Sequence, residues 1–244
     1  MTGWVVVAGL GPGDAALVIP EVDAALAEAT DVLGYFPYVA RVAPRPGLTL
    51  SPSDNREELD RAREALRLAA EGRRVVIVSS GDPGGFAMAS ALFEALEAAT
   101  TPAPQIRVLP GITAMLAAAA RIGAPLGHDF CAINLSDNLK PWELIERRLR
   151  LAAQADFAMA FYNPRSKSRP HQFPRVLEIL REECEPGRLI SFARAVSTPD
   201  EAIRTVTLAE ATPEMADMRT VVILGNSATR RVGDWVYTPR SVSA

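Results

Sequence analysis

The sequence is poor in the residues that build disulfide frameworks and protein-held metal centres. Its 244 residues include 2 cysteines and 2 histidines. Cys131 and Cys184 stand far apart and in no CxxC spacing, which favours a reducing compartment and argues against a thiolate metal site. We therefore expect two ordinary buried thiols and no metal held by the protein.

An excess of basic charge and a long hydrophobic run are also lacking. The formal net charge of -3 gives no positive field to attract nucleic acid, so we expect no nucleic-acid partner. The amino terminus passes without a basic region into the apolar run 4–8, which predicts a first strand rather than a signal peptide. The longest apolar stretch, 112–120, is too short to span a bilayer. These absences predict a cytoplasmic protein with no membrane partner.

Short apolar runs alternate with helical patterns along the chain. The runs predict buried strands at 5–8, 75–78, 106–109, 130–135, 157–161, 189–193 and 221–224. Helices are predicted at 21–29, 55–71, 87–98, 113–122, 142–153 and 172–182. This alternation predicts an α/β protein with right-handed crossovers and largely parallel sheets. A turn-rich segment after 113 predicts a domain boundary there, with domains at 1–114 and 115–244.

The clearest helical pattern is the one at 55–71. Asp54 and Glu57 resemble a capping box at its start, and Gly72 provides a stop at its end. Its apolar positions form one stripe, made of Leu59, Ala62, Leu66, Ala69 and Ala70.

Three glycine-rich turns stand where predicted strands end. Ligands of open α/β sheets bind outside the carboxyl ends of the strands, so these turns predict one small-molecule site. We call them the first loop (Gly9-Leu10-Gly11-Pro12-Gly13-Asp14), the second loop (Ser80-Gly81-Asp82-Pro83, continuing to Gly85) and the third loop (Pro110-Gly111-Ile112-Thr113-Ala114).

The first loop departs from the well-known nucleotide loops. The dinucleotide fingerprint G-x-G-x-x-G has a glycine where Asp14 stands, and no P-loop lysine follows Gly13. Both nucleotide interpretations are therefore disfavoured. The structural alternative is a rigid tight turn in which glycines adopt positive φ and Asp14 caps the segment after it.

The second and third loops are suited to binding a ligand through the main chain. Pro83 favours an extended Asp82, and the glycines at 81, 84 and 85 leave peptide groups uncovered for a zwitterionic or ribose-bearing ligand. An ordinary β-turn is the alternative. The hydroxyl of Thr113 either caps the next helix or meets a ligand.

Together the three loops resemble those of the tetrapyrrole methylases, a family of S-adenosylmethionine-dependent methyltransferases that act on uroporphyrinogen and corrin precursors. The resemblance covers nearly the whole chain. Gly85 is a departure, because the family usually has a branched apolar residue there. Second-half segments are similar to the branch that methylates C17 of precorrin-3B and contracts the ring to precorrin-4 in cobalamin biosynthesis. They are 126–131, 135–137, 141–143, 146–149 and 161–166.

The resemblance implies two α/β domains with the active site in the cleft between them, and a homodimer. It also implies that S-adenosylmethionine is held largely by main-chain groups. The implied cofactor-binding residues are Pro12, Ser80, Gly81, Asp82, Gly85, Thr113, Ala114, Asn163 and Ala195. The first loop then serves mainly the tetrapyrrole substrate, through Gly11, Gly13 and Asp14.

The chemistry implied by the resemblance needs few acid–base groups. Alignment of an electrophilic methyl group with a ring carbon is worth about 7–11 kcal/mol in favourable cases and needs no nucleophilic side chain. Ring contraction moves protons, so a general acid or base is expected. Each candidate also has a structural interpretation: a turn pair, a helix cap or strand packing. The catalytic candidates are His128, Asp129, Asp137 and Tyr162, with Ser136 as a substrate contact.

Corrin precursors carry many carboxylates, so local cations are expected despite the acidic balance. Arg165, Lys167 and Arg169 alternate after the Tyr-Asn-Pro turn and are suited to carboxylates, with a solvated basic loop as the alternative. Arg41 and Arg45 form a second candidate clamp.

The sequence leaves several functions open. One is another corrin-precursor methylase of the same fold, including one that acts on cobalt-precorrin-3. More distant ones are a nicotinamide-dependent oxidoreductase and a tetrapyrrole carrier without activity. A metal-free and a cobalt-loaded macrocycle are not distinguished, because the metal would travel in the substrate.

Overall fold

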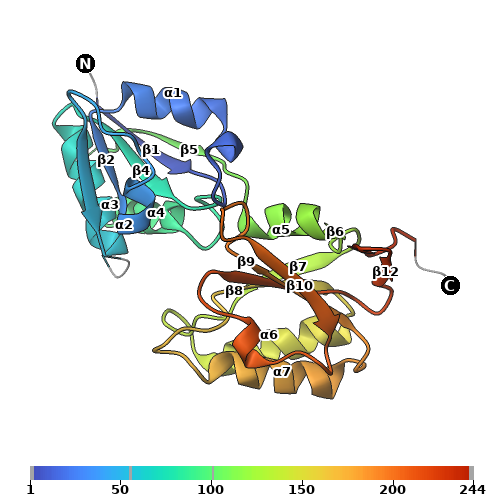
Figure 1. Ribbon diagram of the computed structural model, residues 1–244. Coiled ribbons are helices and arrows are strands. Elements are labelled where there is room, and N and C mark those ends of the chain that lie inside the picture. Colours follow the sequence, from blue (N-terminus) through green and yellow to red (C-terminus); the bar gives the residue numbers. More distant parts are fainter. Residues whose placement is uncertain (1–2, 55–56, 101, 242–244) are drawn as a thin grey trace. The chain divides into compact units, whose positions relative to one another are not determined.

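The computed structural model describes residues 3–54, 57–100 and 102–241 (Figure 1). Contacts within the chain divide it into two compact units, an N-terminal unit ending at Thr113 and a C-terminal unit beginning at Ala114. Within these ranges no helix combines the length and the apolar character needed to cross a membrane. Both cysteines are unpaired thiols, and burial raises the pKa of each.

The N-terminal unit is built on a parallel sheet of five strands in the order β3-β2-β4-β1-β5. The register places Ala8 beside both Val78 and Leu109, so the carboxyl ends of β1, β4 and β5 meet at one edge. This edge carries the three loops. The strands are β1 (Trp4–Gly9), β2 (Asp31–Tyr35), β3 (Thr49–Ser53), β4 (Arg74–Ser79) and β5 (Gln105–Leu109).

Helices cover both faces of this sheet (Figure 1). Val5 and Val7 of β1 pack with α3 and α4, whereas Val6 and Ala8 point to the other face and pack with α1. Burial on both faces explains why the strand reads as an unbroken apolar run. The helices are α1 (Pro20–Glu28), α2 (Phe36–Val39), α3 (Glu58–Ala70) and α4 (Met88–Glu97), with a 3₁₀ turn, η1 (Ala15–Leu17).

The C-terminal unit has a mixed sheet in the order β10-β9-β11-β8-β7. Only β7 and β8 pair in parallel, while β11 runs antiparallel to its neighbours β8 and β9. Our expectation of largely parallel sheets is therefore wrong for this unit. The connection from β9 to β10 contains no helix, so the chain turns back there, and β11 then pairs antiparallel with the other side of β9. The strands are β7 (Phe130–Asn134), β8 (Ala158–Tyr162), β9 (Leu189–Arg194), β10 (Ala202–Thr207) and β11 (Thr220–Leu224).

Helices α6 and α7 lie side by side against this sheet (Figure 1). Their buried residues join the core around Phe161, with Leu149 from α6 and Leu177 from α7. The remaining elements are α5 (Ala114–Ile122), α6 (Trp142–Gln154), α7 (Gln172–Glu183), η2 (Pro213–Met215), and a small sheet of β12 (Arg230–Val232), β13 (Trp235–Tyr237) and β6 (Gly123–Ala124).

All seven predicted strands and all six predicted helices are present. Residues 55–56 of the predicted 55–71 helix lie outside the described residues, and α3 begins at Glu58. The Asp54 N–H donates to Glu57 Oε2 at 3.3 Å, but the predicted capping box does not cap α3, whose N-cap is Glu57 and has no side-chain cap bond. Gly72 ends the helix with φ of 83°. The predicted stripe was partly wrong, because Leu59 and Ala70 are exposed while Arg61 and Ala65 are buried.

Candidate functional site

The three loops of the N-terminal unit meet at a junction of three glycines. A Cβ added to Gly111 would lie 2.1 Å from the carbonyl oxygen of Gly81. A Cβ on Gly9 would lie 2.5 Å from that oxygen and 2.8 Å from the Gly111 Cα. Only glycine allows main chains to approach so closely, so the three loops are packed into one surface.

Main-chain hydrogen bonds join the first loop to the second. The Gly11 N–H donates to the Gly81 oxygen at 3.2 Å, and the Gly81 N–H donates to the Gly11 oxygen at 2.9 Å. Both residues adopt positive φ, 66° at Gly11 and 63° at Gly81; in the first loop our expectation of positive φ holds for Gly11 but not for Gly13. This pair fixes the two loops relative to each other.

The Asp82 carboxylate joins the second loop to the third. Its Oδ1 accepts from the N–H groups of Gly84 at 2.8 Å and Gly85 at 3.1 Å, and its Oδ2 accepts from the Gly111 N–H at 3.1 Å. No sequence pattern indicated this side-chain role. Because the carboxylate is occupied by main-chain donors, a cofactor contact from Asp82 would come from its peptide groups.

Two arginines that we predicted to clamp substrate carboxylates bind main-chain carbonyls instead. Arg41 donates through Nη1 to the Gly11 oxygen at 3.1 Å and through Nη2 to the Leu10 oxygen, so it holds the first loop. Arg45 donates to the carbonyls at the end of α1, including that of Ala29 at 2.6 Å. These bonds favour a role in holding the main chain over the predicted carboxylate clamp for this pair.

The structural interpretation of Asp14 is confirmed. Its Oδ1 accepts from the Ala16 N–H at 2.9 Å, which caps the 3₁₀ turn η1. Pro12 and Gly13 lie between this cap and the Gly11 hydrogen bonds, so the first loop is held at both of its ends.

A second group of predicted site residues lies at the carboxyl ends of β7, β8 and β9. In the sheet register Asn134 is beside Tyr162, and Thr220, at the start of β11, is beside Arg194 at the end of β9. Asn163 and Ala195 follow β8 and β9 directly. Both have left-handed backbones, with φ of 52° and 50°, which is uncommon outside glycine and is concentrated at functional sites.

Asn134 organises this edge and was not predicted as a site residue. Its Oδ1 accepts from the Ser136 N–H at 2.9 Å and from the Asn163 side chain at 3.1 Å. Buried Arg169 donates to the Asn163 carbonyl oxygen at 3.2 Å. Burial lowers the pKa of Arg169, an effect that nearby Asp137 opposes. Arg169 therefore supports Asn163 rather than standing in solvent as a carboxylate clamp.

Tyr162 connects β8 to the start of α5. Its Oη accepts from the Met115 N–H at 3.0 Å, and Met115 directly follows Ala114. Asp137 lies near the same edge, where its Oδ2 accepts from the Gln172 side chain at 3.0 Å. These contacts orient two of the catalytic candidates.

The structure does not bring His128 and Asp129 to this edge. Both precede β7, whereas Asn134 ends it, and five strand residues span about 17 Å. Nδ1 of His128 and Oδ2 of Asp129 are 3.8 Å apart, longer than a hydrogen bond, and the Asp129 side chain is 83% exposed.

A cavity of about 450 Å³ adjoins the Asn163 turn, between the segments 165–170 and 216–219. Its lining includes the predicted pair Arg165 and Lys167, together with Met218 and Arg219, which we did not predict. Arg219 is paired with Asp200 at 3.0 Å. Within the described ranges Arg165 and Lys167 form no ion pair, so their charges remain for an anionic ligand.

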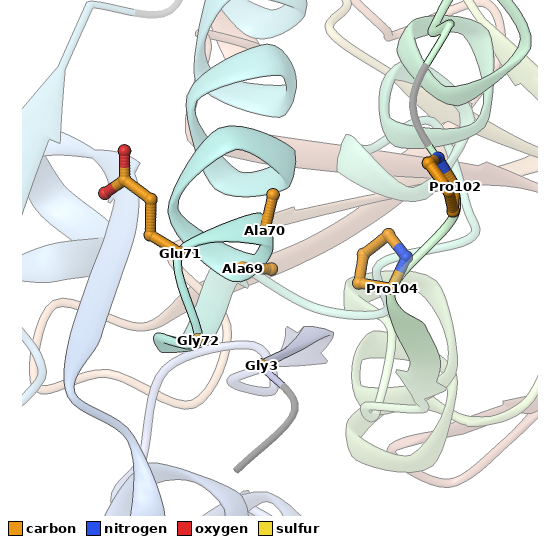
Figure 2. A pocket seen from close by; sticks show the side chains of 7 residues that line it. All are labelled: Gly3, Ala69, Ala70, Glu71, Gly72, Pro102 and Pro104. Atoms are coloured by element: carbon orange, nitrogen blue, oxygen red, sulfur yellow. The ribbon is translucent and has the colours of Figure 1, made fainter.

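A hollow of about 450 Å³ in the N-terminal unit lies at the wrong end of the sheet for this site (Figure 2). Gly3 precedes β1 and Pro104 precedes β5, so the hollow borders the amino ends of the strands. Among the described residues that line it, Glu71 alone is ionisable, and it is paired with Arg67. None of the predicted site residues lines it.

Comparisons with known proteins agree with the loop pattern. Residues 5–212 match the tetrapyrrole (corrin/porphyrin) methylases, and the chain belongs to this family. A precorrin-3B C(17)-methyltransferase of Sinorhizobium sp is 53% identical over 98% of this chain and 97% of its own length. The crystal structure of the methyltransferase CobJ is 78% identical, with a TM-score of 0.94 over 97% of this chain and 100% of that one.

A more distant structure has the same fold. Uroporphyrin-III C-methyltransferase from Thermus thermophilus, complexed with S-adenyl homocysteine, is 24% identical over 91% of each chain, with a TM-score of 0.69. The predicted α/β fold is therefore confirmed as that of tetrapyrrole methylases.

Proposed function

We propose that this chain transfers a methyl group from S-adenosylmethionine to C17 of precorrin-3B and contracts the ring to precorrin-4. The 53% identity to a precorrin-3B C(17)-methyltransferase over almost the full length of both chains carries this assignment. The loop junction of the N-terminal unit and the ordered carboxyl edge of the C-terminal unit support it.

The residues present suit S-adenosylmethionine. Apart from the residues next to it in the chain, a Cβ added to Gly84 or Gly85 would meet only Asp82 Oδ1 within 4 Å, so side chains leave the Cα and carbonyl atoms of the second loop uncovered. When bound, the cofactor supplies an electrophilic methyl group. We assign its binding to Ser80, Gly81, Asp82, Gly85, Thr113, Ala114, Asn163 and Ala195, with Pro12 at the edge towards the substrate.

The Gly85 N–H is occupied by Asp82, so a Gly85 contact would use its carbonyl or Cα. Substrate binding is assigned to Gly11, Gly13, Asp14 and Ser136, and carboxylate binding to Arg165 and Lys167. The cavity beside this pair has the charge that a propionate or acetate side chain requires.

Alignment is the main catalytic requirement, and the mutually bonded loops provide it. For the proton transfers of ring contraction we favour Asp137, because Gln172 orients its carboxylate at the carboxyl edge of the sheet. We assign Tyr162 a positioning role through the Met115 N–H. His128 and Asp129 lie at the other end of β7, so we assign them no proton transfer.

We further propose that the enzyme acts in the cytoplasm as a homodimer. The family resemblance supports the dimer, and the two unpaired thiols support a reducing compartment. Sedimentation equilibrium at several protein concentrations tests the dimer, and a monomer at micromolar concentration would contradict it.

One incubation tests the assigned reaction. The protein is supplied with methyl-labelled S-adenosylmethionine and either metal-free precorrin-3B or its cobalt-loaded counterpart, and the products are analysed by mass spectrometry and NMR. We expect label at C17 of a contracted ring from the metal-free substrate. Label at another carbon, or product from the cobalt-loaded substrate alone, would overturn the assignment. Binding of the macrocycle without methyl transfer would indicate a tetrapyrrole carrier. Tight binding of NAD would indicate an oxidoreductase.

A further inference from the structure

Phe86, directly after the second loop, has an unusual backbone for a bulky residue. Its φ is 60°, in the left-handed region where side chains other than glycine, asparagine and aspartate are rarely found. Its exposure is 52%, so the core does not account for this conformation. Such outliers persist where the surroundings fix the backbone, and they are concentrated at ligand sites.

The chain on both sides of Phe86 is held in place. Before it, Asp82 Oδ1 binds the N–H groups of Gly84 and Gly85. After it, Ala87 is extended and α4 begins at Met88, while the Ala89 N–H donates to the Pro83 oxygen at 3.0 Å. The aromatic ring is thus presented from a short segment with fixed ends.

The chain just before the ring is sparsely covered, because positions 84 and 85 are both glycine. Apart from the residues next to it in the chain, a Cβ added to Gly84 or Gly85 would have only Asp82 Oδ1 within 4 Å. Because Asp82 already occupies both of these N–H groups, this part of the loop offers glycine Cα atoms and an aromatic ring rather than main-chain donors. Such a surface fits the apolar face of a flat ring system better than a charged or hydroxyl-rich ligand.

We propose that Phe86 contacts the face of the tetrapyrrole macrocycle and helps to set the position of its reacting carbon. This assignment rests on the proposed function, because it takes the substrate to be a corrin precursor. The polar parts of the cofactor need donors and acceptors, which Ser80 at the base of the loop is better placed to supply, since the Gly81 N–H is already bonded to the Gly11 oxygen.

Binding measurements on Phe86→Ala and Phe86→Gly test the proposal, with Phe93→Ala as the matched control. Phe93, on α4, is 49% exposed but lies within a regular helix. We expect both Phe86 variants to weaken precorrin-3B binding by about tenfold or more, the value of burying one aromatic ring. Affinity for S-adenosylhomocysteine should change by less than about twofold, and Phe93→Ala should change neither affinity.

The two replacements also separate loss of the ring from disturbance of the loop. Glycine tolerates the left-handed backbone, so Phe86→Gly should melt about 2–4 °C above Phe86→Ala, the reverse of the usual order. If precorrin-3B binding is unchanged, or if S-adenosylhomocysteine binding falls by the same factor, the proposal is wrong. Binding is measured without turnover, and the wild-type product analysis reports separately on the proposed function.

Discussion

The Asp82 carboxylate accepts a hydrogen bond from the Gly111 N–H across 29 positions of sequence, at 3.1 Å. This bond joins the loops after β4 and β5, and the Gly11–Gly81 pair adds the loop after β1. Three segments that are separate in sequence therefore form one prearranged surface. Prearrangement lowers the ordering cost that a ligand would otherwise meet on binding to such a surface.

Replacement of Asp82 by asparagine should weaken cofactor binding. The amide keeps the shape but removes the charge and places two donors where three main-chain N–H groups converge. Hydrogen bonds to charged groups contribute about 1.5–3 kcal/mol, so we expect about a tenfold or greater rise in the Kd of S-adenosylhomocysteine by calorimetry. Asp60→Asn, on an exposed helix face, is the control. An unchanged Kd would show that the loops do not need this link.

Replacement of Gly111 by alanine should strongly destabilise the N-terminal unit. The new Cβ would lie 2.1 Å from the Gly81 carbonyl oxygen, so the junction must open. We expect a loss of about 2–4 kcal/mol in the free energy of unfolding, measured in urea. Gly187→Ala is the matched control, because no atom lies within 4 Å of its added Cβ, and it should change stability by less than about 1 kcal/mol. If both substitutions lowered the free energy of unfolding equally, the close packing of the three loops at Gly111 would be contradicted.

Replacement of Arg41 by lysine should disturb the first loop and leave the others intact. An ammonium group cannot give the forked pair of bonds to the Leu10 and Gly11 carbonyls. Because the first loop is assigned to the substrate, the KM for precorrin-3B should rise by about threefold to tenfold while the Kd of S-adenosylhomocysteine stays constant. Arg63→Lys, in an exposed helical ion pair, should alter neither value. A selective loss of cofactor affinity would place the first loop with the cofactor.

Asp137 and Tyr162 should have separable effects. Asp137→Asn should retain methyl transfer and slow ring contraction by about a hundredfold or more, so that methylated, uncontracted product accumulates. Tyr162→Phe should slow both steps together, because it removes the acceptor of the Met115 N–H. Mass spectrometry of quenched single turnovers distinguishes these outcomes. Full contraction by Asp137→Asn would remove the aspartate from the mechanism.

Stability should depend on Asp31 in acid. Burial of this carboxyl tends to raise its pKa, but hydrogen bonds from Arg73 and Thr30 and the Arg73 charge outweigh that and hold the pKa below its ordinary value of 3.8. A depressed pKa stabilises the fold fully above the unfolded value, and this contribution is lost as pH falls through the lower folded value. Melting curves from pH 6 to about 3 should show a steeper acid loss in wild type than in Asp31→Asn. If the melting temperatures of wild type and Asp31→Asn fell in parallel with pH, the stabilising role of the Asp31 carboxylate would be contradicted.

Local sequence pattern predicted the elements well and their pairing poorly. Buried strands such as β1 and β4 read clearly because both faces are covered. Strands β2 and β3 were missed: β2 is interrupted by Gly34, and β3 is a short, half-exposed edge strand containing Pro52. The antiparallel insertion of β11 between β8 and β9 depends on contacts far apart in sequence, which no local periodicity records.

In the candidate site, too, local features were predictable from the sequence, whereas contacts between distant segments were not. Glycine turns at strand ends were visible in sequence, and so was the capping role of Asp14. The contacts of Asp82 with Gly111 and of Arg41 with Gly11 join distant segments, and neither residue type reveals its partner. Asn134 and Phe86 were missed because their significance lies in three-dimensional placement and in backbone conformation.

The position of β11 also sets a distance. Asn163 and Ala195 follow β8 and β9, and β11 separates these strands, so the two left-handed residues stand about 10 Å apart at the strand spacing of a sheet. Main-chain hydrogen bonding between the strands sets this distance, so side-chain substitutions do not change it. A ligand that touches both turns must reach across the end of β11. Selection at this edge can therefore rest on molecular length as well as on hydrogen-bonding groups.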